Sequence, residues 1–226
     1  MPIDLGRVRG LCFDIDGTIS DTDDAWVDWI TMLLSPLNKV VRRWDSRKFA
    51  RWLVMVTESP LNSIYYIMDA LSLDDNYGRF FDQIARKRGE GGSHFMLMPG
   101  ARELLDAVIS LYPLSVVSAR DQYTAGIFLQ QFGLRDHFVD VVTNLTCKHT
   151  KPYPQPVLYA AQRMKLSPQE CLMIGDTTVD ILSGKRAGAQ TVGLLCGFGT
   201  ERELRRAGAD VILNDLHELR DLLFHR

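Results

Sequence analysis

The sequence predicts an α/β fold, in which a parallel sheet forms the core and an all-helical domain is inserted after the first strand. Short apolar segments alternate with helical patterns from residue 99 onward, as they do in chains of βαβ units. Another apolar segment stands near the N-terminus, and residues 21–94 contain helical patterns without a convincing strand. We therefore expect a Rossmann-like, doubly wound parallel sheet formed by residues 1–20 and 95–226, with a helical domain at 21–94.

The first predicted strand leads directly into acidic residues. Residues 11–13 are apolar, Asp14 and Asp16 flank a single isoleucine, and Gly17 and Thr18 follow. If both acids lie beyond the strand end, side-chain alternation directs them to the same side, at the edge where open α/β sheets bind ligands. Two such carboxylates suit a hard cation such as magnesium, or a division into nucleophile and proton carrier. An Asx turn that caps the next helix is the alternative.

The inserted segment has a helical pattern throughout. The spacing of apolar residues predicts helices over residues 23–34, 46–56, 60–71 and 75–88, and a glycine-rich break follows them. All four tryptophans lie in this segment, which favours the core of a helix bundle over the roof of a pocket. A basic run between residues 39 and 51 favours a solvated helix face, although one or two of its cations could instead reach an anionic substrate.

The remaining elements alternate regularly between strand and helix. Helices are predicted over residues 101–110, 123–132, 156–164, 179–187 and 216–224, and a capping box at 200–203 begins one more. Strands are predicted over residues 113–118, 138–142, 171–174, 191–195 and 210–213. Gly133 follows its helix as a C-terminal cap. This order predicts a parallel sheet with right-handed crossovers.

Composition excludes several classes of function. The 226 residues are 46% hydrophobic with a formal net charge of −2, so nothing in the overall charge favours a nucleic acid or an anionic membrane as partner. No apolar run approaches the roughly 20 residues of a spanning helix, and the first residues lack the apolar centre of a signal peptide. Four cysteines without a Cys-x-x-Cys pair predict reduced thiols, and Cys147 with His149 makes only a weak zinc site. We expect a cytoplasmic protein, monomeric or homodimeric.

Three more predicted strands end in polar residues. Ser118 could form a phosphate cradle with the backbone N–H groups that follow it, or cap a helix. Lys151, in a loop stiffened by prolines, could neutralise a carboxylate and a phosphoryl group, or lie on the surface. Asp176 and Asp180 could share the inner and outer shells of a metal, whereas helix capping explains one of these acids better than both.

Together these motifs resemble the haloacid dehalogenase superfamily. The order is Asp-x-Asp-Gly-Thr, then Ser at a strand end, then Lys-Pro-x-Pro, then Gly-Asp-x-x-x-Asp. Each motif alone is weak, but four in this order and spacing are a strong signal, and the resemblance covers essentially the whole chain. The chain is most similar to the phosphoglycolate phosphatase-like branch, whose helical cap lies between the first two motifs, where this chain has its insert.

The resemblance implies a role for each matching residue. Asp14 would be the nucleophile that forms an aspartyl-phosphate, and Asp16 would protonate the leaving group and then activate water. Ser118 and Lys151 would hold the phosphoryl oxygens. Thr18 would help to position the phosphoryl group. The resemblance also implies a magnesium ion bound by the side chains of Asp14 and Asp176 and the backbone carbonyl of Asp16, with Asp180 supporting it.

One departure from the family pattern concerns the residues after Ser118. Related phosphatases often have Asn there, followed by a small or basic residue, whereas this chain has Ala119 and Arg120. The backbone N–H of Ala119 would still serve the phosphoryl group. Arg120 could reach a substrate anion, or it could merely pair with Asp121.

These features predict a magnesium-dependent phosphatase acting on a small phosphorylated metabolite. Dehalogenases of the family lack the second aspartate, so the presence of Asp16 argues against dehalogenation. A phosphomutase of the β-phosphoglucomutase type uses the same motifs and stays an alternative. A phosphonate-cleaving enzyme would need a cap lysine that no motif singles out. A non-catalytic binding or regulatory protein that kept the fold is an alternative of a different class.

Overall fold

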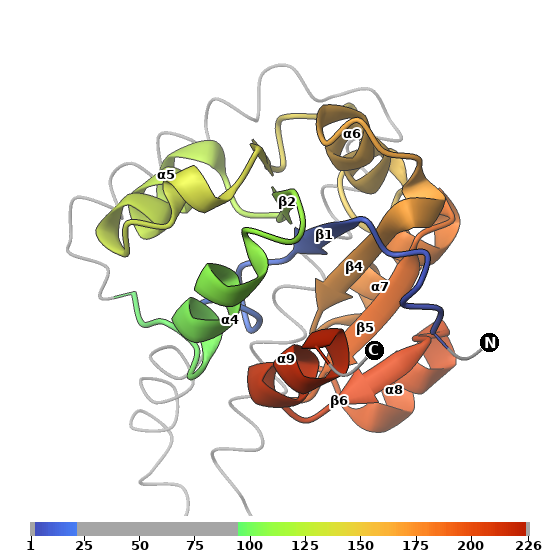
Figure 1. The fold of residues 1–226 in the computed structure, drawn as a ribbon. Helices are drawn as coiled ribbons and strands as arrows, with labels where there is room; N and C mark the ends of the chain where they lie inside the picture. The colour runs from blue at the N-terminus through green and yellow to red at the C-terminus, as the bar shows by residue number, and fades with distance from the viewer. Residues whose placement is uncertain (1–2, 22–94, 225–226) are drawn as a thin grey trace, which may run out of the picture.

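The computed structural model describes residues 3–21 and 95–224, and this part of the chain forms one six-stranded sheet in the order β3-β2-β1-β4-β5-β6 (Figure 1). Every neighbouring pair of strands is parallel, as the sequence predicts. The strands are β1 (Gly10–Phe13), β2 (Leu114–Val117), β3 (Asp140–Val142), β4 (Cys171–Gly175), β5 (Gln190–Leu194) and β6 (Val211–Leu213).

In the described core, helices lie between successive strands, and one more helix follows the last strand. They are α4 (Ala101–Val108), α5 (Gln122–Gln131), α6 (Gln155–Arg163), α7 (Thr178–Ala187), α8 (Glu201–Ala207) and α9 (Leu216–Phe224). Two 3₁₀ turns, η2 (Arg135–His137) and η3 (Pro168–Glu170), lie outside the sequence predictions, because three residues are too few to show a period. The strand predicted at 138–142 begins only at Asp140, two residues later than expected and three residues after the end of η2.

The sheet is covered on both faces, which explains its nearly continuous apolar strands. Leu11 and Phe13 of β1 pack into the larger apolar cluster, together with side chains from α4, α5 and α9. Cys12, between them in the sequence, points to the opposite face and packs with residues of α6. Figure 1 shows α4 and α9, which contact each other, on one side of the sheet.

The carboxyl ends of the central strands bring the predicted site together. Phe13 pairs with Val116 of β2 on one side and with Ile174 of β4 on the other. The chain runs from β1 outward through β2 to β3, and then returns to β4 on the other side of β1. Such a reversal of strand order is the topological switch point at which open α/β sheets bind ligands.

The predicted helical insert lies outside the described residues, so the division into core and cap stays a prediction. Its two connections to the core are described and run side by side. The Asp21 N–H donates to the carbonyl of Met96 at 2.9 Å, and the Met98 N–H donates to that of Ile19 at 3.0 Å. Both connections therefore leave the core together, close to the residues that follow β1. In the described ranges, none of the helices is long and apolar enough to cross a membrane.

Candidate active site

Asp14 is held at the end of β1 by a tight turn. Its N–H donates to the carbonyl of Ile174 at 3.0 Å, and its carboxylate is buried. Beyond it, the N–H groups of residues 18–20 all point to the carbonyl of Ile15, at 2.8–3.2 Å. Gly17 has φ +73°, and a Cβ there would lie 2.4 Å from Oδ2 of Asp176. Only glycine therefore allows this turn to press against the neighbouring acid.

Asp176 follows β4 and is completely buried. The hydroxyl of Thr18 donates to its Oδ1 at 3.2 Å, and the N–H of Phe198 donates to its Oδ2 at 2.8 Å. A Cβ on Gly197 would lie 2.2 Å from Oδ2, so the loop after β5 approaches this carboxylate as backbone alone. The carboxylate is thus oriented from two sides, by the turn after β1 and by the loop after β5.

Lys151 is buried between two acids, with 3% of its side chain exposed. Its Nζ donates to Oδ1 of Asp14 at 2.7 Å and to Oδ1 of Asp180 at 2.6 Å. The loop that carries it is fastened to α7, because the hydroxyl of Ser183 donates to the carbonyl of Tyr153 at 2.6 Å. Lys151 is therefore part of the site, and the surface location considered from the sequence is wrong.

Asp180 serves the helix and the site together. As the third residue of α7 it accepts hydrogen bonds from the N–H and the hydroxyl of Thr177, at 3.0 and 2.5 Å, in a capping box. Its other oxygen accepts from Lys151. The sequence left capping and metal support as alternatives for this pair of acids, and the structure shows that Asp180 caps α7 while lying within reach of Asp14 and Asp176.

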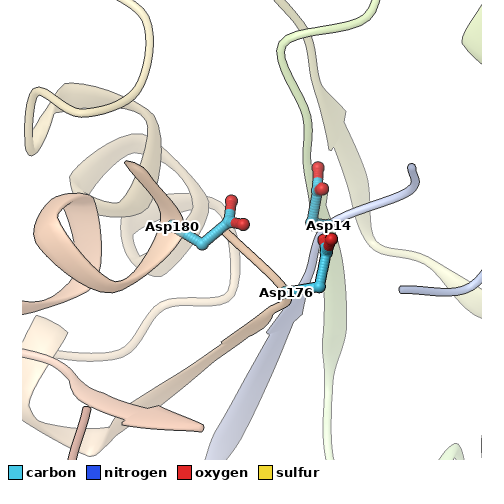
Figure 2. Close-up of side chains that lie close together, drawn as sticks. All are labelled: Asp14, Asp176 and Asp180. Atoms are coloured by element: carbon cyan, nitrogen blue, oxygen red, sulfur yellow. The ribbon is translucent and has the colours of Figure 1, made fainter. Parts of the chain in front are cut away.

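The three acids could hold a cation. Carboxylate oxygens of Asp14, Asp176 and Asp180, all buried, lie within 4.8 Å of one another (Figure 2). Figure 2 shows them converging from the end of β1, the loop after β4 and α7. An all-oxygen donor set of this kind fits a hard divalent cation.

Among the described residues of this group, the three buried acids Asp14, Asp176 and Asp180 outnumber the one lysine that contacts them. Burial raises the pKa of Asp14 to about 7, with the nearby charges of Asp180 and Asp16 adding to the rise and Lys151 opposing it. Burial, with Asp180 and Asp14, also raises the pKa of Asp176 well above its usual range. Burial alone would lower the pKa of Lys151, but Asp14 and Asp180 raise it above its ordinary value, so the lysine stays charged. A second positive charge would stabilise the ionised acids.

Asp16 lies beside this acidic group and binds Arg120. The Nε of Arg120 donates to Oδ2 of Asp16 at 3.0 Å, and its Nη2 forms a close ion pair with Oδ1. Arg120 thus has Asp16 as a direct partner, whereas the carboxylate of Asp121 caps α5 by accepting from the N–H of Thr124 at 2.9 Å. The position of Asp16, a quarter exposed, leaves its carboxylate accessible from outside the core.

Ser118, Ala119 and Thr18 lie around the same edge. Ser118 is buried, and its hydroxyl accepts from the N–H of Arg120 at 3.2 Å, so it turns the loop after β2 and does not cap α5. Ala119 lies half-buried beside it. Thr18 is fully buried with its hydroxyl on Asp176. Their predicted contacts to a phosphoryl group stay predictions.

Sequence reasoning missed the loop at residues 197–199. This loop contributes backbone N–H groups to the site. The N–H of Phe198 donates to the Asp176 carboxylate, and the N–H of Gly199 donates to the Asp176 carbonyl at 3.1 Å. The Gly-Phe-Gly sequence directly after a predicted strand was the available signal, since glycines at the carboxyl edge allow a close backbone approach.

Comparison with known proteins decides the family. The model for "Haloacid dehalogenase-like hydrolase" matches residues 11–194, a span that contains the four acids, Lys151, Arg120, Ser118 and Thr18 but ends just before the loop at 197–199. The chain belongs to the haloacid dehalogenase-like hydrolases. This confirms the resemblance inferred from the four motifs.

Similar proteins support the same assignment over the full length. A phosphoglycolate phosphatase from Chromobacterium violaceum is 28% identical, with 98% of this chain and 99% of the relative covered. The pyrophosphatase PpaX of Oceanobacillus iheyensis is 25% identical, with 94% and 95% covered. A solved haloacid dehalogenase-like hydrolase from Streptococcus pneumoniae, 24% identical, has a TM-score of 0.71 over 98% of this chain and 100% of that one. The last likeness confirms the predicted α/β fold.

Proposed function

We propose that this chain is a magnesium-dependent phosphatase that hydrolyses a small phosphorylated metabolite through an aspartyl-phosphate intermediate. The observation that carries the proposal is the buried group formed by Asp14, Lys151, Asp176 and Asp180 at the switch point of the sheet. The names of the curated relatives, phosphoglycolate phosphatase and pyrophosphatase, support phosphoryl transfer as the chemistry.

In the first half-reaction Asp14 is the nucleophile. Lys151 holds Oδ1 of Asp14 at 2.7 Å, which fixes the orientation of the carboxylate. A carboxylate oxygen of Asp14 forms a bond to phosphorus while the bond from phosphorus to the leaving oxygen breaks. Asp16, in its protonated form, gives its proton to that leaving oxygen as an alcohol departs.

In the second half-reaction Asp16 acts as the base. It takes a proton from the water that attacks phosphorus, and the bond between phosphorus and Asp14 breaks. Inorganic phosphate leaves and Asp16 is again protonated for the next turnover. The ammonium of Lys151 stabilises charge on the phosphoryl oxygens throughout, with Ser118, Thr18 and the N–H of Ala119 as further contacts.

The acidic group fits a magnesium ion. The side chains of Asp14 and Asp176 and the backbone carbonyl of Asp16 would hold it, with Asp180 supporting it. When bound, the ion supplies positive charge that offsets the carboxylates and the transferring phosphoryl group. Thr18 and Phe198 orient Asp176 for this task through the hydrogen bonds described above.

Phosphate release from a panel of substrates tests the proposal. The panel contains phosphoglycolate, pyrophosphate, sugar phosphates and nucleoside monophosphates, each with magnesium and then with excess chelator. We expect release that needs magnesium, and we expect Asp14→Asn to abolish it while the protein stays folded. Release that survives in Asp14→Asn would exclude this residue as the nucleophile.

Three other outcomes would redirect the assignment. Pyrophosphate as the best substrate would favour the activity named for the relative from Oceanobacillus iheyensis. A folded protein that releases no phosphate from any panel member, yet interconverts sugar phosphate isomers, would be a phosphomutase. A protein that does neither would favour the non-catalytic binding alternative.

A further inference from the structure

Arg120 binds the Asp16 carboxylate through two hydrogen bonds, which fix the orientation of that carboxylate. Nε and Nη2 of the guanidinium face Oδ2 and Oδ1, so both carboxylate oxygens are engaged by one planar group. A two-point contact of this kind determines the plane of the carboxylate as well as its position, which a lysine in the same place would not do. Asp16 itself lies within the turn at residues 15–20, where the N–H of Gly17 donates to the carbonyl of Ser20 at 3.0 Å.

The guanidinium is in turn held in place by its surroundings. Its Cζ lies 4.9 Å from the ring centroid of Phe95 and 5.6 Å from that of Phe128, within the range of cation–π contacts. These two rings pack edge to face at 5.8 Å. The Arg120 backbone is also anchored, since its carbonyl accepts from the N–H of Asn144 at 3.2 Å. With 9% of its side chain exposed, Arg120 is part of the interior.

Stability does not explain this arrangement. A buried ion pair is often no more stable than apolar groups of the same volume, because both charges must leave water. The site around the guanidinium already contains two aromatic rings, so an apolar side chain would pack there. The contact matters instead for Asp16 in the proposed function: Arg120 holds the carboxylate that takes a proton from the attacking water, and one of the two hydrogen bonds must be given up when Asp16 carries the proton for the leaving oxygen.

We propose that Arg120 is a positioning residue, which acts on phosphoryl transfer through Asp16 and not through the substrate. This inference rests on the proposed function of the site. It gives Arg120 a partner inside the catalytic group, which neither of the sequence-based alternatives, a substrate anion or Asp121, had named. In this proposal the rings of Phe95 and Phe128 hold the guanidinium in place.

A double-mutant cycle with two substrates tests the inference. The variants are Arg120→Met, Arg120→Lys, Asp16→Asn and the two doubles, assayed with magnesium on an alkyl phosphate and on p-nitrophenyl phosphate. The alkyl leaving group needs a proton, whereas p-nitrophenolate leaves without one. Arg163→Met is the matched control, because it removes another arginine–aspartate pair, with Asp140, at the opposite edge of the sheet.

We expect Arg120→Met to lower kcat for the alkyl phosphate by about 10²-fold, the cost typical of a misplaced reacting group, with little change in KM. The pre-steady-state burst of p-nitrophenol should be retained, and the later steady-state rate should fall. Each double variant should be no slower than Asp16→Asn alone. Arg120→Lys should recover part of the loss, and Arg163→Met should keep the wild-type rate.

Several results would overturn the inference. If Arg120→Met slowed Asp16→Asn by the same factor as it slows the wild type, or raised KM instead of lowering kcat, Arg120 would act on the substrate. An unchanged or faster Arg120→Met enzyme would remove the positioning role. If Arg120→Met did not fold, Arg120→Lys and its double with Asp16→Asn would make the same comparison. A wild type without phosphatase activity would remove the proposed function and this inference together.

Discussion

The raised pKa of Asp14 makes the stability of the metal-free protein depend on pH. The carboxyl has a pKa of about 7 in the folded protein and an ordinary value of 3.8, so the folded state holds its proton more tightly than the unfolded chain does. The stabilisation is fully present below the unfolded value and is lost as pH rises through about 7. The metal-free protein should therefore become less stable from about pH 4 to pH 7 and level off above that.

The size of the effect follows from the shift. A difference of about 3 pKa units corresponds to about 4 kcal/mol over the whole range, of which about 3 kcal/mol falls between pH 5 and pH 8. Other groups, including Asp176, titrate in the same range. Asp14→Asn removes this one titration while keeping a side chain of the same shape, so the difference between the two proteins isolates it.

The assay is urea unfolding with excess chelator at pH 5, 6, 7 and 8. We expect the free energy of unfolding of the wild type to fall by about 3 kcal/mol more than that of Asp14→Asn between the end points. Magnesium should stabilise the wild type more at pH 8 than at pH 5, because the proton on Asp14 competes with the ion. If the free energy of unfolding changed with pH in the same way in both proteins, the assignment of a buried, proton-binding Asp14 would be refuted.

Three further substitutions test other parts of the site. Asp16→Asn should lower kcat by about 10²–10⁴-fold, and an unchanged rate would show that proton transfer does not run through Asp16. Lys151→Met removes the cation that contacts both Asp14 and Asp180. The free energy of unfolding, measured with chelator, should therefore fall by about 3–5 kcal/mol, and unaltered stability would contradict the buried ion pairs. Gly197→Ala places a Cβ 2.2 Å from Asp176 unless the loop shifts, so half-maximal activity should need more magnesium, and an unaltered magnesium requirement would argue against this contact.

The fold of the described core could be predicted nearly completely, because its signals are local. Alternating apolar segments and helical periods marked every strand of the described core, with differences of one or two residues at most ends. The two 3₁₀ turns were missed since three residues carry no period. Parallel order followed from the βαβ alternation, as right-handed crossovers leave few other topologies.

The candidate site could be predicted as a set of residues but not as a set of contacts. Asp14, Asp176 and Lys151 follow different strands, and the parallel sheet explains why their strand ends meet at one edge. Which oxygen Lys151 binds depends on packing between segments more than 100 residues apart. The same is true of Arg120, whose partner is 104 positions away, while the adjacent Asp121 caps a helix instead.

The sequence by itself determined the order of strands and helices and the residues that end at the ligand-binding edge, because these depend on neighbours along the chain. Only the tertiary structure decided the charge state and orientation of the acids. Burial raises the pKa of Asp14, the loop at 197–199 orients Asp176, and Arg120 orients Asp16. Each of these effects requires desolvation or a partner distant in sequence, and neither is encoded in a local pattern.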